Sequence, residues 1–259
     1  MNSKKGGQVL QSVDRALSIL QLLAEGSREG LSLTEISRRL ELNQSTCHHL
    51  LSTLRARRFV SQDRKTRRYH LGITAVKVGQ AASQQVDLVR VALPRMEELM
   101  ALVEENINLV VLDAESVIYV AQVPCKRMVR MFTRIGERAP VHCTGVGKVL
   151  LAGLPQKERS DLVSRLDLSP FTAATICEPD LLLQELEQVV AQGYAVDEEE
   201  REEDVTCIAA PVRDYSQNVV AAISISAPSS RMDKARQQEV LPDLLATAEQ
   251  ISQDLGYRK

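Results

Sequence analysis

The chain has 259 residues, of which 44% are hydrophobic and 25% are charged, which is typical of a globular protein with one large or two ordinary domains. Aromatic residues make up only 3% and Trp is absent, so the cores must be built from aliphatic side chains. No apolar run approaches the ~18 residues of a membrane span, and the first ten residues lack the apolar stretch of a secretion signal.

The cysteines favour a reducing compartment. They are scattered along the chain with no CxxC pair, which argues against a disulfide framework and against a zinc ribbon. We therefore expect a cytoplasmic protein that has no membrane partner. The five positions are Cys47, Cys125, Cys143, Cys177 and Cys207.

Charge is distributed unevenly along the chain, although the formal net charge is only −2. Residues 1–80 carry 14 Lys and Arg against 6 Asp and Glu, a net charge of +8. The remaining residues carry 18 against 28, a net charge of −10. A basic segment joined to an acidic one predicts that only the first meets a polyanion.

The basic segment opens with an amphipathic pattern. Within residues 13–25, Val13, Leu17 and Leu20 fall on one face of a helix, and Gly26 follows as its stop signal. The sequence therefore predicts a first helix over 13–25.

Two further helices are predicted close behind the first. Residues 31–42 form the second, and Ser32 and Glu35 stand at capping-box spacing. The third covers 43–58 and begins with the N-cap residue Asn43. Two short helices with a tight link predict a helix-turn-helix that binds double-stranded DNA. The polar residues expected to face DNA are Gln44, Ser45, Thr46, His48, His49 and Arg55.

A basic hairpin is predicted directly after the third helix. Residues 59–72 pair two short apolar runs around a turn at 63–66. This position is that of the wing of a winged helix-turn-helix, whose cations reach phosphates or the minor groove. The alternative is a solvated basic face. The wing residues predicted to contact DNA are Arg64, Lys65, Arg67 and Arg68.

The acidic segment mixes helical and strand-like patterns. Residues 73–109 predict a linker helix and a second long helix, which Pro94 could kink or restart. Strands followed by helices and a late alternating run favour an α+β sandwich, with an antiparallel sheet covered by helices. The strand-like runs are 107–113, 116–123, 127–134 and 219–228, and the later helices are 155–165, 180–192 and 235–255.

The stretch HCTGVGKVLL at 142–151 looks like a phosphate-binding loop. Such a loop needs Gly at position 142, where His stands, and Ser or Thr after Lys148, where Val149 stands. We therefore expect no nucleotide cofactor. The free N–H groups at the start of this helix can bind a small carboxylate, or the glycines can simply allow close packing. The sequence leaves both interpretations open.

Six segments, in this order, resemble the IclR family of bacterial transcriptional regulators from about residue 10 to 256. They are VDRALSIL, STCHHLLSTLRARRFV, RRYHLG, PVHCTGVGKVLLA, GYAVDEEEREEDVTCIAAPV and VVAAISIS. One position departs from the pattern, since His49 stands where many members carry Arg, and this leaves the operator sequence open.

The resemblance implies an architecture. It implies a winged helix-turn-helix over 10–72, a linker helix over 73–86 and a GAF-like α/β sandwich effector domain over 87–259. It also implies homodimers or homotetramers that control catabolic operons, and we expect a repressor.

The resemblance also implies an effector site. Two methionines would form its adaptable apolar wall, and two serines alternate on one face of a strand. Segments similar to the allantoin-pathway and ketodeoxygluconate branches of the family predict a small 2-oxo acid such as glyoxylate, with a sugar acid as the alternative. The implied contacts are Met128, Met131, Gly145, Val146, Asp197, Cys207, Ala209, Ser224 and Ser226.

The acidic segment also contains residue types that occur in zinc sites and in cysteine enzymes. A zinc site from His142, Cys143, Asp197 and Cys207 has the right ligand types but no fixed spacing, so no metal is predicted. A cysteine enzyme needs a thiolate beside a base, and neighbours such as His142 and Cys143 point to opposite faces of a strand. An enzyme would also leave the basic segment unexplained, so we predict a non-enzymatic regulator.

Overall fold

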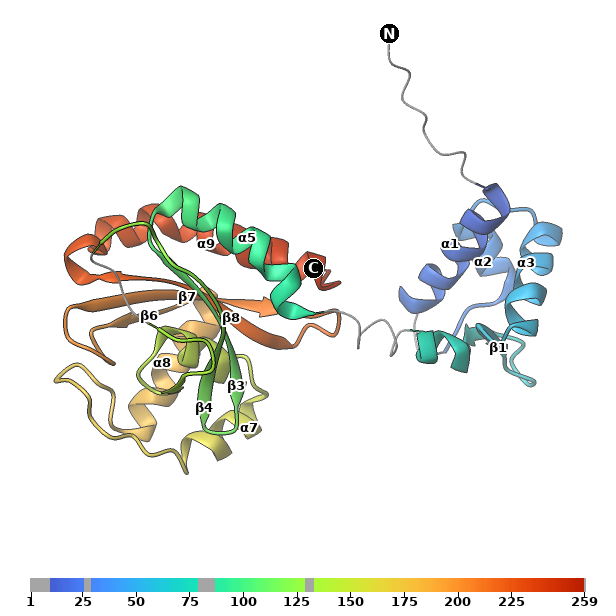
Figure 1. Cartoon of the computed structure of the whole chain (residues 1–259). Helices are drawn as coiled ribbons and strands as arrows, with labels where there is room; N and C mark the ends of the chain where they lie inside the picture. Colours follow the sequence, from blue (N-terminus) through green and yellow to red (C-terminus); the bar gives the residue numbers. More distant parts are fainter. Residues whose placement is uncertain (1–9, 26–28, 79–86, 129–132, 259) are drawn as a thin grey trace, which may run out of the picture. The chain divides into compact units, whose positions relative to one another are not determined.

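The computed structural model describes residues 10–25, 29–78, 87–128 and 133–258 (Figure 1). The chain divides into two compact units, residues 1–86 and 87–259. Among the described helices, none is long and apolar enough to cross a membrane.

The first unit contains three helices followed by a hairpin. The helices are α1 (Gln11–Glu25), α2 (Leu33–Arg39) and α3 (Gln44–Ala56). Strands β1 (Val60–Gln62) and β2 (Tyr69–Leu71) pair antiparallel. This order confirms the helix-turn-helix predicted from the sequence, and the hairpin lies where the wing is expected.

Side-chain caps fix where α2 and α3 begin. The Ser32 hydroxyl accepts from the backbone N–H of Glu35 at 3.3 Å, and the Glu35 carboxylate accepts from the Ser32 N–H at 2.7 Å. The Asn43 side chain accepts from the Thr46 N–H at 2.8 Å. The predicted capping box and N-cap are both confirmed. The helices and hairpin share one apolar core, made of Ile19, Leu23, Leu31, Ile36, Cys47, Leu51, Val60 and Tyr69.

A short helical stretch over residues 73–78 follows the hairpin. Ile73, Val76 and Val78 are more than half exposed there. The remainder of the predicted linker helix, residues 79–86, lies outside the described residues.

The second unit is built on a six-stranded sheet in which every neighbouring pair is antiparallel. Its strand order is β5-β4-β3-β8-β7-β6, so β3 and β8 lie at the centre. The strands are β3 (Asn106–Asp113), β4 (Ser116–Val123), β5 (Arg138–Pro140), β6 (Ala195–Glu198), β7 (Val205–Arg213) and β8 (Val219–Pro228).

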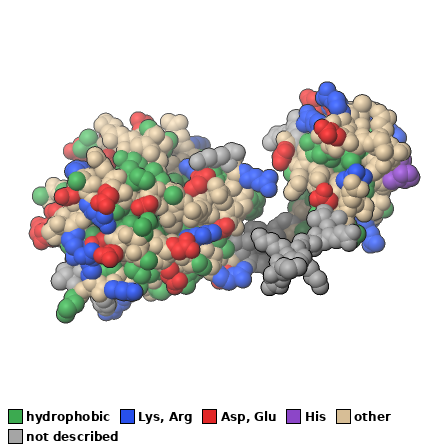
Figure 2. All heavy atoms as spheres, turned by 90° about the horizontal axis from the view of Figure 1, so that it is seen from above, with side chains coloured by type: hydrophobic (Ala, Val, Ile, Leu, Met, Phe, Trp, Pro, Cys, Tyr) green, Lys and Arg blue, Asp and Glu red, His purple; other side chains and the backbone are tan. Residues whose placement is uncertain are grey.

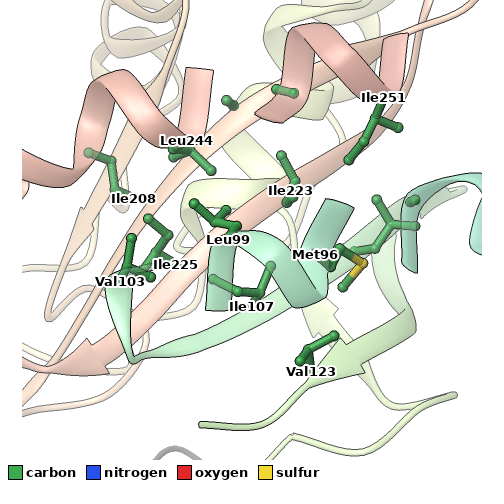
Figure 3. Packing of buried hydrophobic residues seen from close by; sticks show 14 of the residues in the cluster. Met96, Leu99, Val103, Ile107, Val123, Ile208, Ile223, Ile225, Leu244 and Ile251 are labelled. Atoms are coloured by element: carbon green, nitrogen blue, oxygen red, sulfur yellow. The ribbon is translucent and has the colours of Figure 1, made fainter. Parts of the chain in front are cut away.

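Helices cover both faces of this sheet (Figure 1). On one face α5 (Leu88–Val103) and α9 (Lys234–Asp254) lie side by side, and Leu99 and Leu244 pack with Ile223 of β8 (Figure 3). The other face is covered by α6 (Gly145–Ala152), α7 (Gln156–Val163) and α8 (Pro179–Gln192), while a single 3-10 turn, Ser229–Arg231, precedes α9. The predicted α+β class with a sandwich domain is confirmed.

Successive side chains of β8 point to opposite faces of the sheet, so the two faces carry different residues. Ile223 and Ile225 enter the core beneath α5 and α9, whereas Ala222 packs on the α6 side. Ser224 and Ser226 share the side of Ala222 because side chains two residues apart point the same way. The strand therefore carries two buried hydroxyls to the face on which α6 begins.

Two local expectations need correction. The strand-like run 127–134 forms no strand in its described part, and the edge of the sheet is instead β5. Pro94 neither ends nor restarts α5, which continues through it. Pro94 is exposed, so the carbonyl it leaves without an N–H partner can bond to water, while Met96 and Leu99 on the buried face hold the helix in place.

Candidate functional site

The outward face of α3 presents polar side chains to solvent. Gln44, Ser45, His48 and His49 are exposed, as is Arg55 near the end of the helix. Figure 2 shows exposed histidines on the surface of this unit. The two rings of His48 and His49 lie 6.2 Å apart at 73°, so they are not stacked. Thr46, the remaining predicted contact on this helix, is half-buried, and its N–H is bound by the Asn43 cap.

A groove of about 370 Å³ separates α3 from the start of α2 and from the hairpin. Arg55 and Gln62 line it, and the Arg55 guanidinium donates to the Gln62 side-chain oxygen at 3.0 Å. Gln62 in turn donates to the backbone carbonyl of Arg67 at 2.9 Å. The first bond ties the hairpin to α3, and the second holds the hairpin together across its turn.

The hairpin tip is ordered by Asp63, whose carboxylate accepts from the N–H groups of Lys65 at 2.8 Å and Thr66 at 2.7 Å. Those bonds, with Thr66 first, lower the pKa of Asp63. Arg64, Lys65 and Arg67 are exposed, and among the described residues nothing pairs with their side-chain charges. Three unpaired cations on an ordered turn suit contact with phosphates.

Arg68 differs from the other three basic residues of the hairpin. Its guanidinium donates to the Gly30 carbonyl at 3.0 Å and pairs with the Glu35 carboxylate at 3.0 Å. The Ser32 N–H, and then the Arg68 charge, lower the pKa of Glu35 to about 2. These bonds fix the hairpin to the start of α2, and contact of Arg68 with DNA stays a prediction.

The second unit contains a cavity of about 100 Å³ where α6 begins against the sheet. Six of the nine predicted effector residues line it: Gly145, Val146, Asp197, Cys207, Ser224 and Ser226. Met128 and Ala209 are not among the lining residues. Met128 is 99% exposed, and the apolar wall expected from the two methionines stays a prediction. Met131 lies outside the described residues, and Ala209 packs beneath Gly145.

A buried amide orients the two serine hydroxyls. Asn108 of β3 is paired with Ser224 in the sheet, and its side-chain nitrogen donates to Ser226 at 3.1 Å and to Ser224 at 3.4 Å. The Asn108 side-chain oxygen accepts from Thr133 at 3.1 Å and from Gln122 at 3.2 Å. Since the Ser224 oxygen is an acceptor in this network, its hydrogen is available to a ligand. Sequence reasoning missed Asn108, although a polar residue within the apolar run NINLVV was a signal.

Asp197 is the buried acid of the cavity. Burial raises the pKa of its carboxyl to about 7. The Glu200 N–H donates to this carboxylate at 2.8 Å and acts in the opposite direction, lowering the pKa. Burial likewise raises the pKa of Cys143 to about 12 and raises that of Cys207. Both thiols therefore stay protonated near neutral pH, which disfavours a cysteine nucleophile.

The two glycines of the motif have different roles. A Cβ on Gly147 would lie 2.2 Å from the Val141 carbonyl oxygen, so close packing requires glycine there. A Cβ on Gly145 would meet nothing nearer than the Cys207 carbonyl oxygen at 3.4 Å, an ordinary contact. Close packing therefore requires glycine at position 147. It does not require glycine at position 145, which lines the cavity. Lys148 is buried and paired with Glu200 at 2.6 Å, so it does not serve as a phosphate-loop lysine.

Replacing each glycine by alanine tests this difference. Gly147→Ala should lower the free energy of unfolding by about 1–3 kcal/mol, because the new methyl overlaps backbone. Gly145→Ala should leave stability nearly unchanged, but its methyl would lie beside Cys207 and Asp197 and should weaken effector binding about tenfold. Urea unfolding and calorimetry measure the two effects. Equal losses of stability in both variants would contradict the assignment.

Of the four residues of the conceivable zinc site, Asp197 and Cys207 are paired across β6 and β7 and line the same cavity. His142 and Cys143 lie in the turn before α6 rather than in a strand. The His142 ring nitrogen lies 3.1 Å from the Ser169 carbonyl, and burial lowers the pKa of the ring. Across the described parts of the chain, no group of three or more His, Cys, Asp or Glu side chains could hold a metal ion.

Comparison with known proteins covers both units. The family profile for the bacterial transcriptional regulator IclR C-terminal domain matches residues 80–253. The profile for the IclR helix-turn-helix domain matches residues 12–64.

Individual relatives are similar along nearly the whole chain. The HTH-type transcriptional repressor AllR of Escherichia coli K12 is 39% identical over 259 residues, covering 99% of this chain and 93% of the relative. The HTH-type transcriptional regulator KdgR of the same strain is 38% identical over 248 residues, covering 96% and 94%. The crystal structure of Pseudomonas aeruginosa HmgR matches with a TM-score of 0.79 at 29% identity, covering 96% of this chain and 99% of that one.

Proposed function

This chain belongs to the IclR family of bacterial transcriptional regulators, and on that premise we propose that it is a repressor controlled by a small carboxylate. The first unit binds operator DNA through α3 and the wing, and the second unit binds the effector in the cavity at the start of α6. The protein acts in the cytoplasm, where bacterial DNA is located.

The residues that line the cavity support the proposal that the effector is a small 2-oxo acid. Gly145 and Val146 are the first residues of α6, where N–H groups have no acceptor within the helix, and the helix dipole favours an anion. Thr144 caps Gly147 and leaves these two donors to a ligand. The Ser224 hydroxyl lies on the same cavity and can donate to a keto oxygen. A cavity of about 100 Å³ suits a ligand of few atoms, such as glyoxylate or pyruvate.

A ketodeoxy sugar acid is the second candidate. The cavity is also lined by Asp197, Glu137 and Thr133, whose oxygens can accept hydrogen bonds from sugar hydroxyls. A longer ligand would need the cavity to open further. The two ligand classes are distinguished by titration.

We also propose that copies of this chain associate, as a dimer or a tetramer. One helix-turn-helix reads only a few base pairs, and two related by symmetry read a palindromic site. The exposed apolar residues Val13 and Leu17 on α1, with Ile73 and Val76 after the hairpin, provide a surface for a second copy.

Calorimetry with glyoxylate, pyruvate and ketodeoxygluconate tests the effector proposal. Ser224→Ala and Ser226→Ala should each weaken effector binding about ten- to a hundredfold, because a hydrogen bond to a charged ligand contributes about 1.5–3 kcal/mol. Ser252→Ala is the matched control, since it removes a buried hydroxyl of α9 that bonds within the protein.

The control should lose stability and keep full effector affinity. Operator affinity measured without effector should be unchanged in the serine variants, because DNA is bound by the other unit. Unchanged effector affinity in both cavity variants would remove this cavity from consideration. Binding of the sugar acid alone would keep the cavity and reject the 2-oxo acid.

A further inference from the structure

Arg201 is a cation at the effector cavity whose guanidinium has no carboxylate partner in the part of the chain that the structure describes. It lies between β6 and β7, lines the cavity and is partly buried. Its guanidinium carbon lies 4.2 Å from the centre of the Phe171 ring. The Arg201 backbone N–H is hydrogen-bonded to the Asp197 carboxylate, but among the described residues no carboxylate or carbonyl pairs with the guanidinium itself. Arg138, the other arginine of the cavity, is instead paired with Asp113.

The contact with Phe171 leaves the hydrogen-bonding edge of the guanidinium available. An aromatic face attracts the flat face of the cation, whereas the N–H donors point outward in the plane of the group. The charged groups that line the cavity are otherwise Asp197, Glu137 and Glu202, which are acidic, and the paired Arg138. Arg201 is therefore the lining cation that is free to balance an anionic ligand within the described residues.

The loop that carries Arg201 is braced from two sides. The Glu200 carboxylate is 2.6 Å from the Lys148 ammonium of α6, and the Glu200 N–H donates to Asp197 at 2.8 Å. The Thr172 hydroxyl donates to the Glu199 carbonyl at 2.6 Å, and the Thr175 hydroxyl donates to the Glu200 carbonyl at 2.6 Å. The segment that holds the loop is thus the one that supplies Phe171.

This bracing makes the guanidinium a preorganised donor. A side chain whose backbone and flat face are already fixed loses little conformational freedom when it binds an anion. A guanidinium can form two parallel hydrogen bonds with a carboxylate, which a lysine cannot reproduce.

We infer that Arg201 binds the carboxylate of the effector and restricts the site to anionic ligands. This inference rests on the proposed function, since it names the residue that selects the carboxylate in the same cavity. Neutral analogues of the same shape lack the charge that Arg201 recognises, so the wild-type protein should discriminate against them.

The test is calorimetry with pyruvate and its neutral amide, pyruvamide, on full-length protein. Wild type should prefer pyruvate, and Arg201→Gln should weaken pyruvate binding about ten- to a hundredfold while changing pyruvamide binding less than threefold. Arg201→Lys should recover only part of the loss. Arg159→Gln is the matched control, because Arg159 is a buried arginine of α7 that bonds to the Ala152 carbonyl outside the cavity.

Each outcome separates the inference from the function on which it rests. If wild type binds glyoxylate or pyruvate and Arg201→Gln binds them equally well, Arg201 has no role in recognition and the inference is wrong. If Arg201→Gln weakens pyruvate and pyruvamide by the same factor, the residue acts on the shape of the site and the inference is again wrong. If wild type binds none of the acids, including ketodeoxygluconate, the proposed effector class itself fails, and the inference fails with it.

Discussion

Replacement of Arg64, Lys65 and Arg67 by alanine together is expected to weaken binding to every DNA sequence about 100- to 1,000-fold at 0.1 M salt for each hairpin that contacts the DNA. Each phosphate contact releases about 0.9 counterions, so each contributes close to one decade of affinity at that salt concentration. The slope of log affinity against log salt should become shallower by about 3 for each hairpin that contacts DNA. The three side chains are exposed and unpaired among the described residues, so their removal should leave the fold intact.

Arg68→Ala is the informative comparison. It removes the pair with Glu35 and the bond to Gly30, so it should lower the thermal unfolding midpoint of the protein. The folded fraction should keep the salt slope of wild type. Titration of labelled operator at several salt concentrations, alongside thermal unfolding, measures both quantities. A triple variant with the slope of wild type would show that the hairpin does not contact phosphate.

Local rules predicted the elements of the first unit well, because the signals there lie within a few residues of each other. The capping box of Ser32 with Glu35 and the Asn43 cap both form. Arg68 could not be separated from its basic neighbours, since its partner Glu35 lies 33 residues away in the chain. Only the packed hairpin shows which arginine is used internally.

At the effector cavity, too, local sequence patterns predicted the strand residues but not the contacts between distant segments. The period-2 pattern of β8 places Ser224 and Ser226 on one face, as the sequence predicts. Asn108 and Arg201 were missed because their roles depend on strand pairing and on a loop held by a distant segment. Resemblance to a family also placed Met128 at the site, whereas its side chain is 99% exposed and is not among the residues that line the cavity.

The pKa of Asp197 makes the stability of the second unit depend on pH. In the folded chain burial raises this pKa from 3.8 to about 7. Below the pKa of 3.8 that applies to the unfolded chain, the carboxyl is protonated in both the folded and the unfolded state, so its burial has no electrostatic cost. As pH rises from about 4 to 7 the unfolded chain loses this proton while the folded chain retains it, so stability falls. The full cost, reached above pH 7, is about 4 kcal/mol.

Asp197→Asn should remove this dependence. The Asn side-chain oxygen can still accept from the Glu200 N–H, so the variant keeps the bond that Asp197 makes in the fold. The variant should match wild type near pH 4 and exceed it by up to about 4 kcal/mol near pH 8. Urea unfolding at pH 4, 6 and 8 measures the difference, and Asp243→Asn on α9 controls for the loss of one negative charge. Parallel curves for wild type and Asp197→Asn would contradict the raised pKa.

The same carboxyl should link effector binding to proton uptake. An anionic ligand beside Asp197 favours its protonated form, because two negative charges in one small cavity repel. Effector affinity should therefore fall about tenfold for each pH unit above 7 in wild type, since binding then requires one proton per ligand. In Asp197→Asn the affinity should be independent of pH over the same range. Calorimetry in buffers of different ionisation enthalpy counts the protons directly. A wild-type affinity that is flat from pH 6 to 9 would show that the effector does not approach this carboxyl.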